Sequence, residues 1–432
     1  MLFLLDIILI INIWIAYRYF SCLMAPPVLM GGGMLAASYY NEWEMDTMLG
    51  ESVCLLGGGT FFFTICCILF SYVFCISRLN RSAKVELDFL KQARMETFYV
   101  FSIIVALVGV VLKLYYMVAQ FGALGWAELI VAKRMDDWNG DDLLQIPFYV
   151  RQMGSYTSIV AYLTVWLLVI MSISEKKNRR ILRILLIVHL MFTFVDGMLS
   201  GSKAPILGII MLFAVSFFFV FYAKRGNFNL SRKFFVRGLV VLVVLASLFR
   251  GLSMVIGRNV SERSNWDLLA EYCGAEIKNF DLYLQQNSKR RNSAIWGENT
   301  FHSFYSEINP NFERENGEFQ YVGDYILGNV YTQFRPFHED FGIVGIFTMC
   351  FFIAFISMFF YSRSTCAFIE PTKINVYVFI YASIAMSIFM SFFSSRFTES
   401  ICRMGWIRSS IYLVVLVWFV KHYLIKSYVI KK

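Results

Sequence analysis

Long apolar runs dominate the pattern of hydrophobic and polar positions along the chain. Eleven stretches are apolar enough to predict membrane-spanning helices, because about 20 apolar residues cross a bilayer. They cover residues 2–20, 25–40, 53–77, 97–120, 147–173, 181–199, 204–223, 238–256, 341–362, 374–394 and 405–423. The second stretch is short, so counts of ten and twelve stay open as alternatives. The pattern predicts an all-α polytopic integral membrane protein.

The composition supports this class. Of the 432 residues, 58% are hydrophobic and 16% are charged, whereas a soluble domain has about 25% charged and 45–50% apolar residues. The first apolar run, Leu2 to Ala16, follows no basic segment and ends without a small-residue cleavage site. We therefore expect a retained helix rather than a signal peptide.

Basic segments mark the side of the membrane that each loop occupies. Segments 77–94, 175–183 and 224–237 each hold five Lys or Arg residues. Because cytoplasmic loops are enriched in these residues, the N-terminus is predicted on the outer side of the membrane and the C-terminus on the cytoplasmic side. The net charge of +9 then reflects this bias and anionic lipid on the inner leaflet, and we expect no nucleic-acid partner.

Two sizeable loops fall on the predicted outer side, at 121–146 and 257–337. A structureless loop as long as the second is unusual, and the apolar periodicity within 266–286 predicts a helix there. The expected organisation is an N-terminal transmembrane bundle over 1–256, the large outer loop over 257–337, and a C-terminal bundle over 338–432.

Two glycine triplets, Gly31-Gly32-Gly33 and Gly57-Gly58-Gly59, lie within or beside predicted spans. Glycine in a membrane helix usually permits close helix packing. No Lys-Ser or Lys-Thr follows either triplet, so neither predicts a phosphate-binding loop.

The cysteines and histidines predict no metal site, because the sequence has no C-x-x-C pair and no H-x-x-x-H pattern. Only Cys273 and Cys402 would face an oxidising compartment, as two free thiols or as one disulfide. His189 falls inside the sixth span, where we expect it to make a helix-packing hydrogen bond rather than to relay protons.

The most crowded group of ionisable residues lies in "YTQFRPFHEDFGIVG", residues 331–345. Charges at the ends of membrane spans are costly and are functional candidates. Pro336 suits a first helical position, so the ninth span should begin there with Arg335 just outside it. The free N–H groups of a helix N-terminus form an anion site. Alternatively, Glu339 and Asp340 only complement the helix dipole, and Arg335 only anchors at the interface.

Further candidates flank other outer span ends. Lys203 precedes Pro205 at the predicted start of the seventh span, where it could also be a snorkelling residue. Arg250 and Arg258 flank the exit of the eighth span. Two helix N-termini with adjacent cations suit a lipid-linked pyrophosphate. Further polar or ionisable candidates on the predicted outer side are Glu271, Tyr272, Asp281, Arg396 and Arg403.

Three motifs resemble one family. "NVYTQFRPFHEDFGIVGIF" resembles the Y-T-x-F-x-x-F-x-x-D-F-G-x-x-G signature of O-antigen polymerases, which join the repeat units of bacterial surface polysaccharides. "LSGSKAPIL" looks like the G-S-R or G-G-R turn of that family, and "EYCGAEIKNFDLYL" is similar to a helical segment of its large outer loop. Lys203 stands where the family often has Arg, and lysine lacks the planar two-pronged grip on phosphate.

The resemblance implies a fold similar to the C-type glycosyltransferases and a reaction at the periplasmic face of the bacterial inner membrane. The growing glycan would pass from undecaprenyl pyrophosphate to a hydroxyl of an incoming lipid-linked repeat unit, in lipopolysaccharide or other surface polysaccharide synthesis. No metal or other cofactor is expected. Membrane lipid and a chain-length regulator are the other expected partners. An O-antigen ligase and a flippase for the lipid-linked sugar are the alternatives.

The resemblance also assigns roles to residues. Asp340 matches the family's D-F-G position and is the first candidate for the general base, with Glu339 and His338 as alternatives and Glu271 or Asp281 as more distant ones. The expected pyrophosphate-binding residues are Arg335, Arg258, Lys203, Arg250 and Tyr331. The expected glycan-binding residues are Glu271, Tyr272, Asp281, Arg396 and Arg403.

Overall fold

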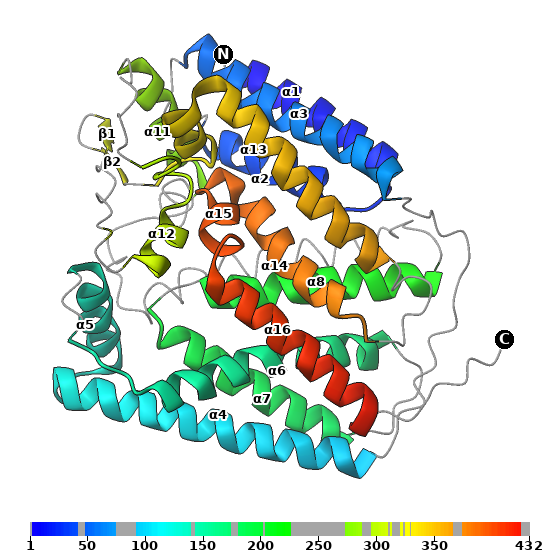
Figure 1. The fold of residues 1–432 in the computed structure, drawn as a ribbon, viewed down its shortest axis with the longest axis vertical. Coiled ribbons are helices and arrows are strands. Elements are labelled where there is room, and N and C mark those ends of the chain that lie inside the picture. Colours follow the sequence, from blue (N-terminus) through cyan, green and yellow to red (C-terminus); the bar gives the residue numbers. More distant parts are fainter. Residues whose placement is uncertain are drawn as a thin grey trace. The chain divides into compact units, whose positions relative to one another are not determined.

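The computed structural model describes residues 2–41, 48–74, 92–139, 143–173, 180–201, 204–225, 273–286, 295–309, 312, 320–322, 325–328, 330–365 and 374–424 (Figure 1). Nearly all of the regular structure in these residues is helical. The exception is a short antiparallel hairpin of β1 (Gln320–Val322) and β2 (Tyr325–Gly328).

Eight helices in the described part of the chain are long and apolar enough to cross a membrane. They are α1 (Leu2–Phe20), α3 (Gly50–Val73), α4 (Gln92–Phe121), α6 (Phe148–Ile173), α7 (Arg180–Met198), α8 (Ala204–Arg225), α13 (Phe334–Thr365) and α16 (Met404–Phe419, extended by one π-helical turn over Val420–Leu424). Each coincides with one of the eleven predicted spans. The protein is therefore a polytopic helical membrane protein, as predicted.

The other three predicted spans have different outcomes. The span expected at 25–40 is α2 (Pro26–Asn41), whose 16 residues are fewer than the roughly 20 that cross a bilayer. The span expected at 374–394 is the shorter apolar helix α14 (Val376–Phe389), continued by a 3₁₀ turn. The span expected at 238–256 lies outside the described residues.

Shorter helices lie between the long ones. The helix predicted within 266–286 is present as α11 (Ala275–Gln285), and its expected first residues up to 272 lie outside the described part. The short helices are α5 (Trp126–Asn139), α11 (Ala275–Gln285), α12 (His302–Ile308) and α15 (Arg396–Ser400).

The chain forms two compact units that interleave along the sequence, whereas the predicted three-part organisation follows sequence order. The first unit contains residues 1–78, 264–366 and 380–408. The second contains the remaining segments, 79–263, 367–379 and 409–432.

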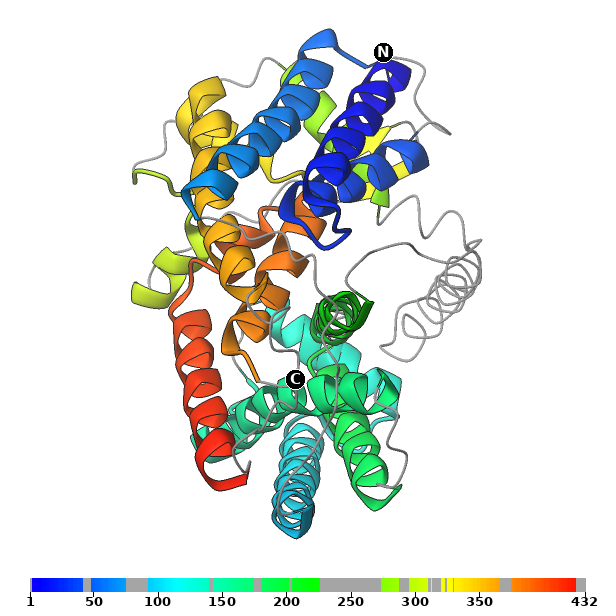
Figure 2. The same ribbon diagram turned by 90° about the vertical axis from the view of Figure 1, so that its right-hand side faces the viewer.

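Three long helices of the first unit run parallel to one another. Helices α1 and α3 pack in the same direction, because residues early in α1 contact residues early in α3 and later residues contact later ones. Ile8 lies against Gly57, and the hydroxyl of Tyr19 is 2.7 Å from Ser71 Oγ. Helix α13 follows α3 in the same direction, with ring pairs such as Phe70–Phe351 at 5.1 Å. The N-terminal ends of α1, α3 and α13 therefore lie at one end of this unit (Figure 2).

The two glycine triplets, one in α2 and one in α3, allow close packing between helices of the first unit. In the first triplet, Gly31 faces α1 and Gly33 lies against the carbonyl oxygen of Phe389, while Gly32 has open space beside it. In the second, Gly57 faces α1 and Gly59 faces α13, where a Cβ would lie 3.0 Å from the ring of Phe334. The first and third glycines of each triplet thus allow contact with two different neighbours, which confirms the predicted packing role.

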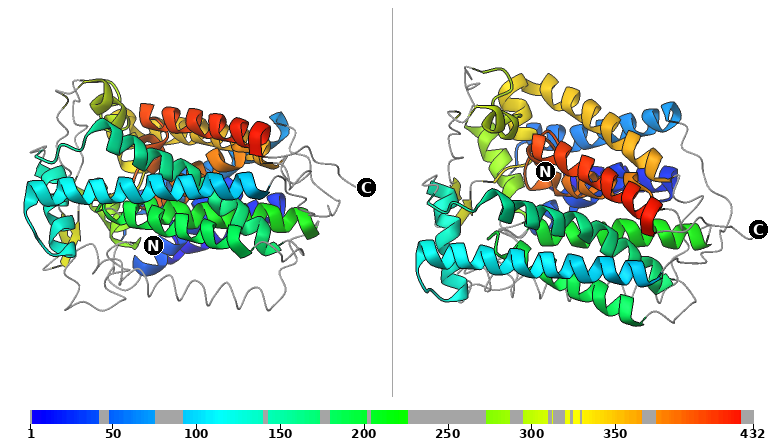
Figure 3. Two further views of the ribbon diagram at one scale, coloured as in Figure 1. Left: turned by 90° about the horizontal axis from the view of Figure 1, so that it is seen from below. Right: turned by 60° about the horizontal axis from the view of Figure 1, so that its bottom comes forward.

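The second unit packs α4, α6, α7 and α8 against one another (Figure 3). His189 of α7 is fully buried, and its Nδ1 is 3.1 Å from Thr164 Oγ1 of α6. This is the expected helix-packing hydrogen bond. At the far end of α7, Asp196 forms an ion pair of 2.9 Å with Lys113 of α4. Polar pairs of this kind tie neighbouring helices together where the hydrophobic effect between them is weak.

Candidate functional site

The start of α13 differs from its predicted form in two ways. The helix begins at Phe334, so Arg335 lies inside the first turn rather than just before a helix starting at Pro336. Gly342 then has φ 67° and ψ −158°, and this non-helical residue separates residues 334–341, which we call the mouth helix, from the apolar remainder. Only glycine adopts such a positive φ without steric cost.

Arg335 is held on three sides. Its Nε donates to Glu339 Oε1 over 2.7 Å, one helical turn away. Its guanidinium carbon is 3.5 Å from the ring centroid of Tyr331 and 4.9 Å from that of Tyr283 in α11. Two aromatic faces and one carboxylate therefore fix the plane of the guanidinium, through cation–π attraction and a charge-assisted hydrogen bond.

One end of this guanidinium stays without an acceptor. Nη1 of Arg335 is buried, and no hydrogen-bond acceptor for it is present among the described residues. The side chains of Arg335 and Glu339 are only 17% and 12% exposed. A buried N–H without an acceptor is costly, and an anion oxygen would satisfy it.

His338 contacts α11. Its Nδ1 is 3.0 Å from the hydroxyl of Tyr283, and the two rings meet edge to face at 5.7 Å. Tyr283 therefore contacts both Arg335 and His338, which lie almost one turn apart on the mouth helix. Sequence reasoning did not single out Tyr283, although it lies two residues after the predicted site residue Asp281.

Asp340 makes contacts of a different kind. Its Oδ1 accepts hydrogen bonds from the backbone N–H and the side-chain amide of Asn299, and its Oδ2 accepts one from the backbone N–H of Thr300 at 2.6 Å. The hydroxyl of Thr300 donates to the carbonyl of Pro336. Both carboxylate oxygens are thus used to attach the 299–300 backbone to the mouth helix.

Aromatic packing strengthens this attachment. The rings of Trp296 and Phe341 have centroids 5.0 Å apart, and Gly297, with φ 69°, lies directly against Phe341 and Phe301. No sequence pattern distinguished residues 296–301, because their partner at Asp340 is some 40 residues further along the chain.

Asp281 of α11 is fully buried, and it contacts the start of α3. Its Oδ1 accepts hydrogen bonds from the backbone N–H of Leu49 and from Ser52 Oγ, at 2.9 and 2.6 Å. Its Oδ2 accepts from Gln285 and lies 3.5 Å from Lys278 Nζ. These contacts attach α11 to α3, so α11 carries Tyr283 to the mouth helix from a fixed position.

The two candidate arginines of the C-terminal segment lie around α15 and α16. Arg396 pairs with Glu399 at 3.5 Å. Arg403 Nε donates to Glu307 Oε1 at 3.0 Å, and Glu307 Oε2 accepts the backbone N–H of Met404 at 2.7 Å. Among the described residues, no hydrogen bond or ion pair joins either arginine to the mouth helix.

The structure thus brings together Tyr331, Arg335, His338 and Glu339, while Asp340 and Asp281 hold the segments around them. Five predicted site residues lie outside the described part of the chain. They are Lys203, Arg250, Arg258, Glu271 and Tyr272.

Cys273 and Cys402 are free thiols, so the alternative of a disulfide between them is not found. Burial raises the pKa of the Cys402 thiol to about 11. Burial and the nearby Glu276 raise the pKa of Cys273 to about 12. Both thiols are therefore protonated and weakly reactive near neutral pH.

The chemistry that this arrangement offers is anion binding beside a proton acceptor. The fold and the site together define a polytopic helical membrane protein with a preorganised arginine at the end of a membrane helix. No protein-family model, curated protein or solved structure matches the chain.

Proposed function

We propose that this protein polymerises lipid-linked oligosaccharide repeat units. It would transfer a growing glycan from undecaprenyl pyrophosphate to the incoming unit at the periplasmic face of the inner membrane, as an O-antigen polymerase does. The resemblance of residues 329–347 to that family motivates the proposal. The guanidinium of Arg335, whose buried Nη1 has no acceptor among the described residues, is the observation that carries it.

In this proposal, Arg335 binds the pyrophosphate leaving group. Negative charge develops on the bridging oxygen as the glycosidic bond breaks, and a donor already oriented toward it stabilises the transition state. Tyr331 and Tyr283 hold the guanidinium plane, and Glu339 holds Nε. Nη1 of the same fork then donates to a phosphate oxygen, whereas lysine would offer only a point charge.

The acceptor hydroxyl needs a general base beside this anion. Asp340 holds that role by family resemblance, but three hydrogen bonds already occupy its carboxylate. Glu339 has one oxygen engaged by Arg335, and its side chain is 12% exposed. We therefore assign proton acceptance to Glu339, with His338 as the alternative, and the positioning of the 299–300 backbone to Asp340.

Deletion of the gene in its native host tests the function. Loss of a polymerase leaves lipid A core bearing one repeat unit on a gel of surface polysaccharide, because export and ligation still proceed. Bare core would instead indicate a ligase or a flippase. An unchanged ladder of long polymer would contradict all three functions. Complementation with the intact gene is the control.

A further inference from the structure

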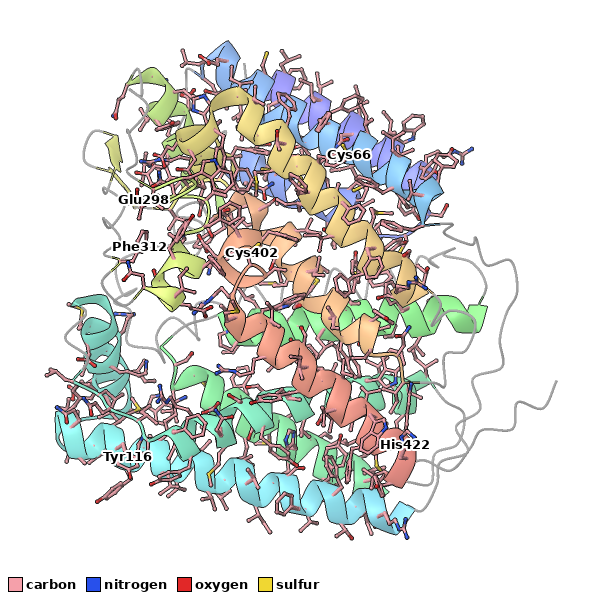
Figure 4. All side chains as sticks on the ribbon, in the orientation of Figure 1. Cys66, Tyr116, Glu298, Phe312, Cys402 and His422 are labelled. Atoms are coloured by element: carbon pink, nitrogen blue, oxygen red, sulfur yellow. The ribbon has the colours of Figure 1, made fainter. Side chains whose placement is uncertain are left out.

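A cavity of about 320 Å³ lies between residues 295–309 and the start of α16 in the first unit. We call residues 295–309 the strap. The cavity is mostly apolar, with one cation among its lining residues. These are Trp296, Phe301, Phe304, Tyr305, Cys402, Arg403, Met404 and Ile407, and Figure 4 marks Cys402.

Two carboxylates hold the strap in place over this cavity. Asp340 of the mouth helix binds the strap backbone at Asn299 and Thr300. At the other end, Glu307 of the strap binds Arg403 and the N–H of Met404. Between these points, the hydroxyl of Tyr305 donates to the carbonyl of Trp296 at 2.8 Å. The cavity is therefore walled by anchored residues on both sides.

The lining continues into the exposed apolar face of a membrane helix. Trp296 is 72% exposed, and Met404 and Ile407 are about half exposed. Ile411 extends the same exposed face one turn further along α16, a helix apolar enough to cross a membrane. Large apolar side chains at the end of such a helix lie at the boundary between headgroups and hydrocarbon, where tryptophan is enriched.

Arg403 supplies the polar end of this cavity. Its side chain is 47% exposed, and Glu307 uses only Nε among the donors of the guanidinium. An arginine beside an apolar cavity at the membrane surface matches a molecule with a phosphate at one end and a hydrocarbon chain at the other, because the guanidinium fork suits phosphate.

We infer that this cavity binds one acyl chain of a bilayer glycerophospholipid, with the lipid phosphate at Arg403. The cavity volume lies at the low end of ligand pockets, about 300–1,000 Å³, so it accommodates part of one chain rather than a whole lipid. Bilayer phospholipids surround α16 at high concentration, which favours them over scarcer chains by mass action. The inference does not depend on the proposed enzymatic function.

Cys402 provides a reporter inside the cavity. The purified, delipidated protein is treated with a maleimide at mildly alkaline pH, and the alkylation rate of each cysteine is measured by peptide mass spectrometry. At a dioleoyl phosphatidylglycerol concentration near ten times its Kd, we expect alkylation of Cys402 to slow about tenfold. Cys54, an exposed thiol on α3, is the control for nonspecific coverage and should keep its rate.

Three further compounds distinguish the possible sources of protection. Glycerol phosphate, which has no chain, should not protect Cys402, and dioleoylglycerol, which has no phosphate, should protect only at higher concentrations. Protection by a polyprenyl phosphate without protection by phospholipid would overturn the inference. Equal protection of Cys402 and Cys54, or no protection of either, would overturn it as well.

A pair of variants tests the cavity by a second readout. Met404→Trp fills the cavity, whereas Ile411→Trp adds the same ring about two turns further along the exposed face. Native mass spectrometry after reconstitution should show one fewer bound phospholipid for Met404→Trp and the wild-type number for Ile411→Trp. Equal lipid retention in both variants would contradict the site.

Discussion

The backbone N–H of Thr300 donates a hydrogen bond of 2.6 Å to Asp340 Oδ2 across 40 residues of chain. Together with the two donors from Asn299, it makes this carboxylate an anchor for the strap. Asp340 also matches the D-F-G position of the family signature, and the resemblance makes it a candidate for the general base. The two roles predict different behaviour of isosteric variants.

If Asp340 anchors the strap, Asp340→Asn should weaken the anchor without abolishing polymer. The new amide still offers one oxygen but turns an N–H toward a backbone donor, at a cost of about 1–3 kcal/mol. We expect a lower thermal unfolding temperature in detergent and a reduced but present polymer ladder. Glu339→Gln should instead abolish polymer. Its amide oxygen still accepts from Arg335 Nε, but the charge that balances Arg335 is lost, so we expect a lower unfolding temperature as well. A normal ladder from Glu339→Gln would contradict its assignment as the base.

Polymer synthesis should depend on the guanidinium of Arg335, so that both its removal and its replacement reduce polymer. Arg335→Lys keeps the charge but loses the planar fork and its stacking on Tyr331 and Tyr283, so we expect polymer to fall by at least tenfold. Tyr331→Phe and Tyr331→Leu form a matched pair, because only leucine removes the cation–π contact, which contributes about 0.5–2 kcal/mol. Polymer length and amount on gels should follow the order wild type, phenylalanine, leucine. Wild-type ladders from Arg335→Ala would exclude this residue from the reaction.

The glycine triplets offer internal controls for helix packing. Gly33→Ala places a methyl group against the Phe389 carbonyl and should destabilise by about 1–3 kcal/mol through overpacking. Gly32→Ala meets nothing within 4 Å, and it gains up to about 1 kcal/mol of helix propensity. In detergent, the unfolding temperature should therefore fall for Gly33→Ala and rise for Gly32→Ala. Equal shifts for the two variants would argue against the contact with Phe389.

Asp281 should be required for folding rather than for proton transfer. Asp281→Ala leaves the Leu49 N–H and the Ser52 hydroxyl without their buried acceptor, at about 1–3 kcal/mol for each group. We expect lower amounts of protein in the membrane and a lower unfolding temperature. Ser52→Ala removes one of the same bonds and should show a smaller shift of the same sign. An inactive but fully stable Asp281→Ala variant would instead support a catalytic role.

The predicted topology is open to a direct test with reporter fusions. Fusions at Lys84 and Asn229 should report the cytoplasm, and a fusion at Asn292 should report the periplasm, because the basic segments flank the first two positions. The parallel direction of α1, α3 and α13 requires their N-terminal ends to share one side if all three cross the membrane. A cytoplasmic signal at Asn292 would place the mouth helix on the wrong side for the proposed reaction.

Apolar run length predicted the long helices well because it is a local property. A stretch such as 148–173 must form its backbone hydrogen bonds internally in hydrocarbon, whatever its neighbours are. Prediction was weaker where the helix is short or broken. The short length of the stretch at 25–40 already left its role as a span open, and α2 has only 16 residues. The break at Gly342 became visible only through its backbone angles.

In the candidate site too, local sequence predicted some features and tertiary contacts decided the others. The sequence by itself determined that Arg335, His338, Glu339 and Asp340 crowd one end of a membrane helix, because their spacing is local. Only the tertiary structure decided their partners: Tyr283 beside Arg335 and His338, the strap on Asp340, and the start of α3 on Asp281. These contacts join residues 40 to 232 positions apart. They arise from side-chain shape and hydrogen-bond satisfaction in the packed interior, which leave no periodic trace along the chain.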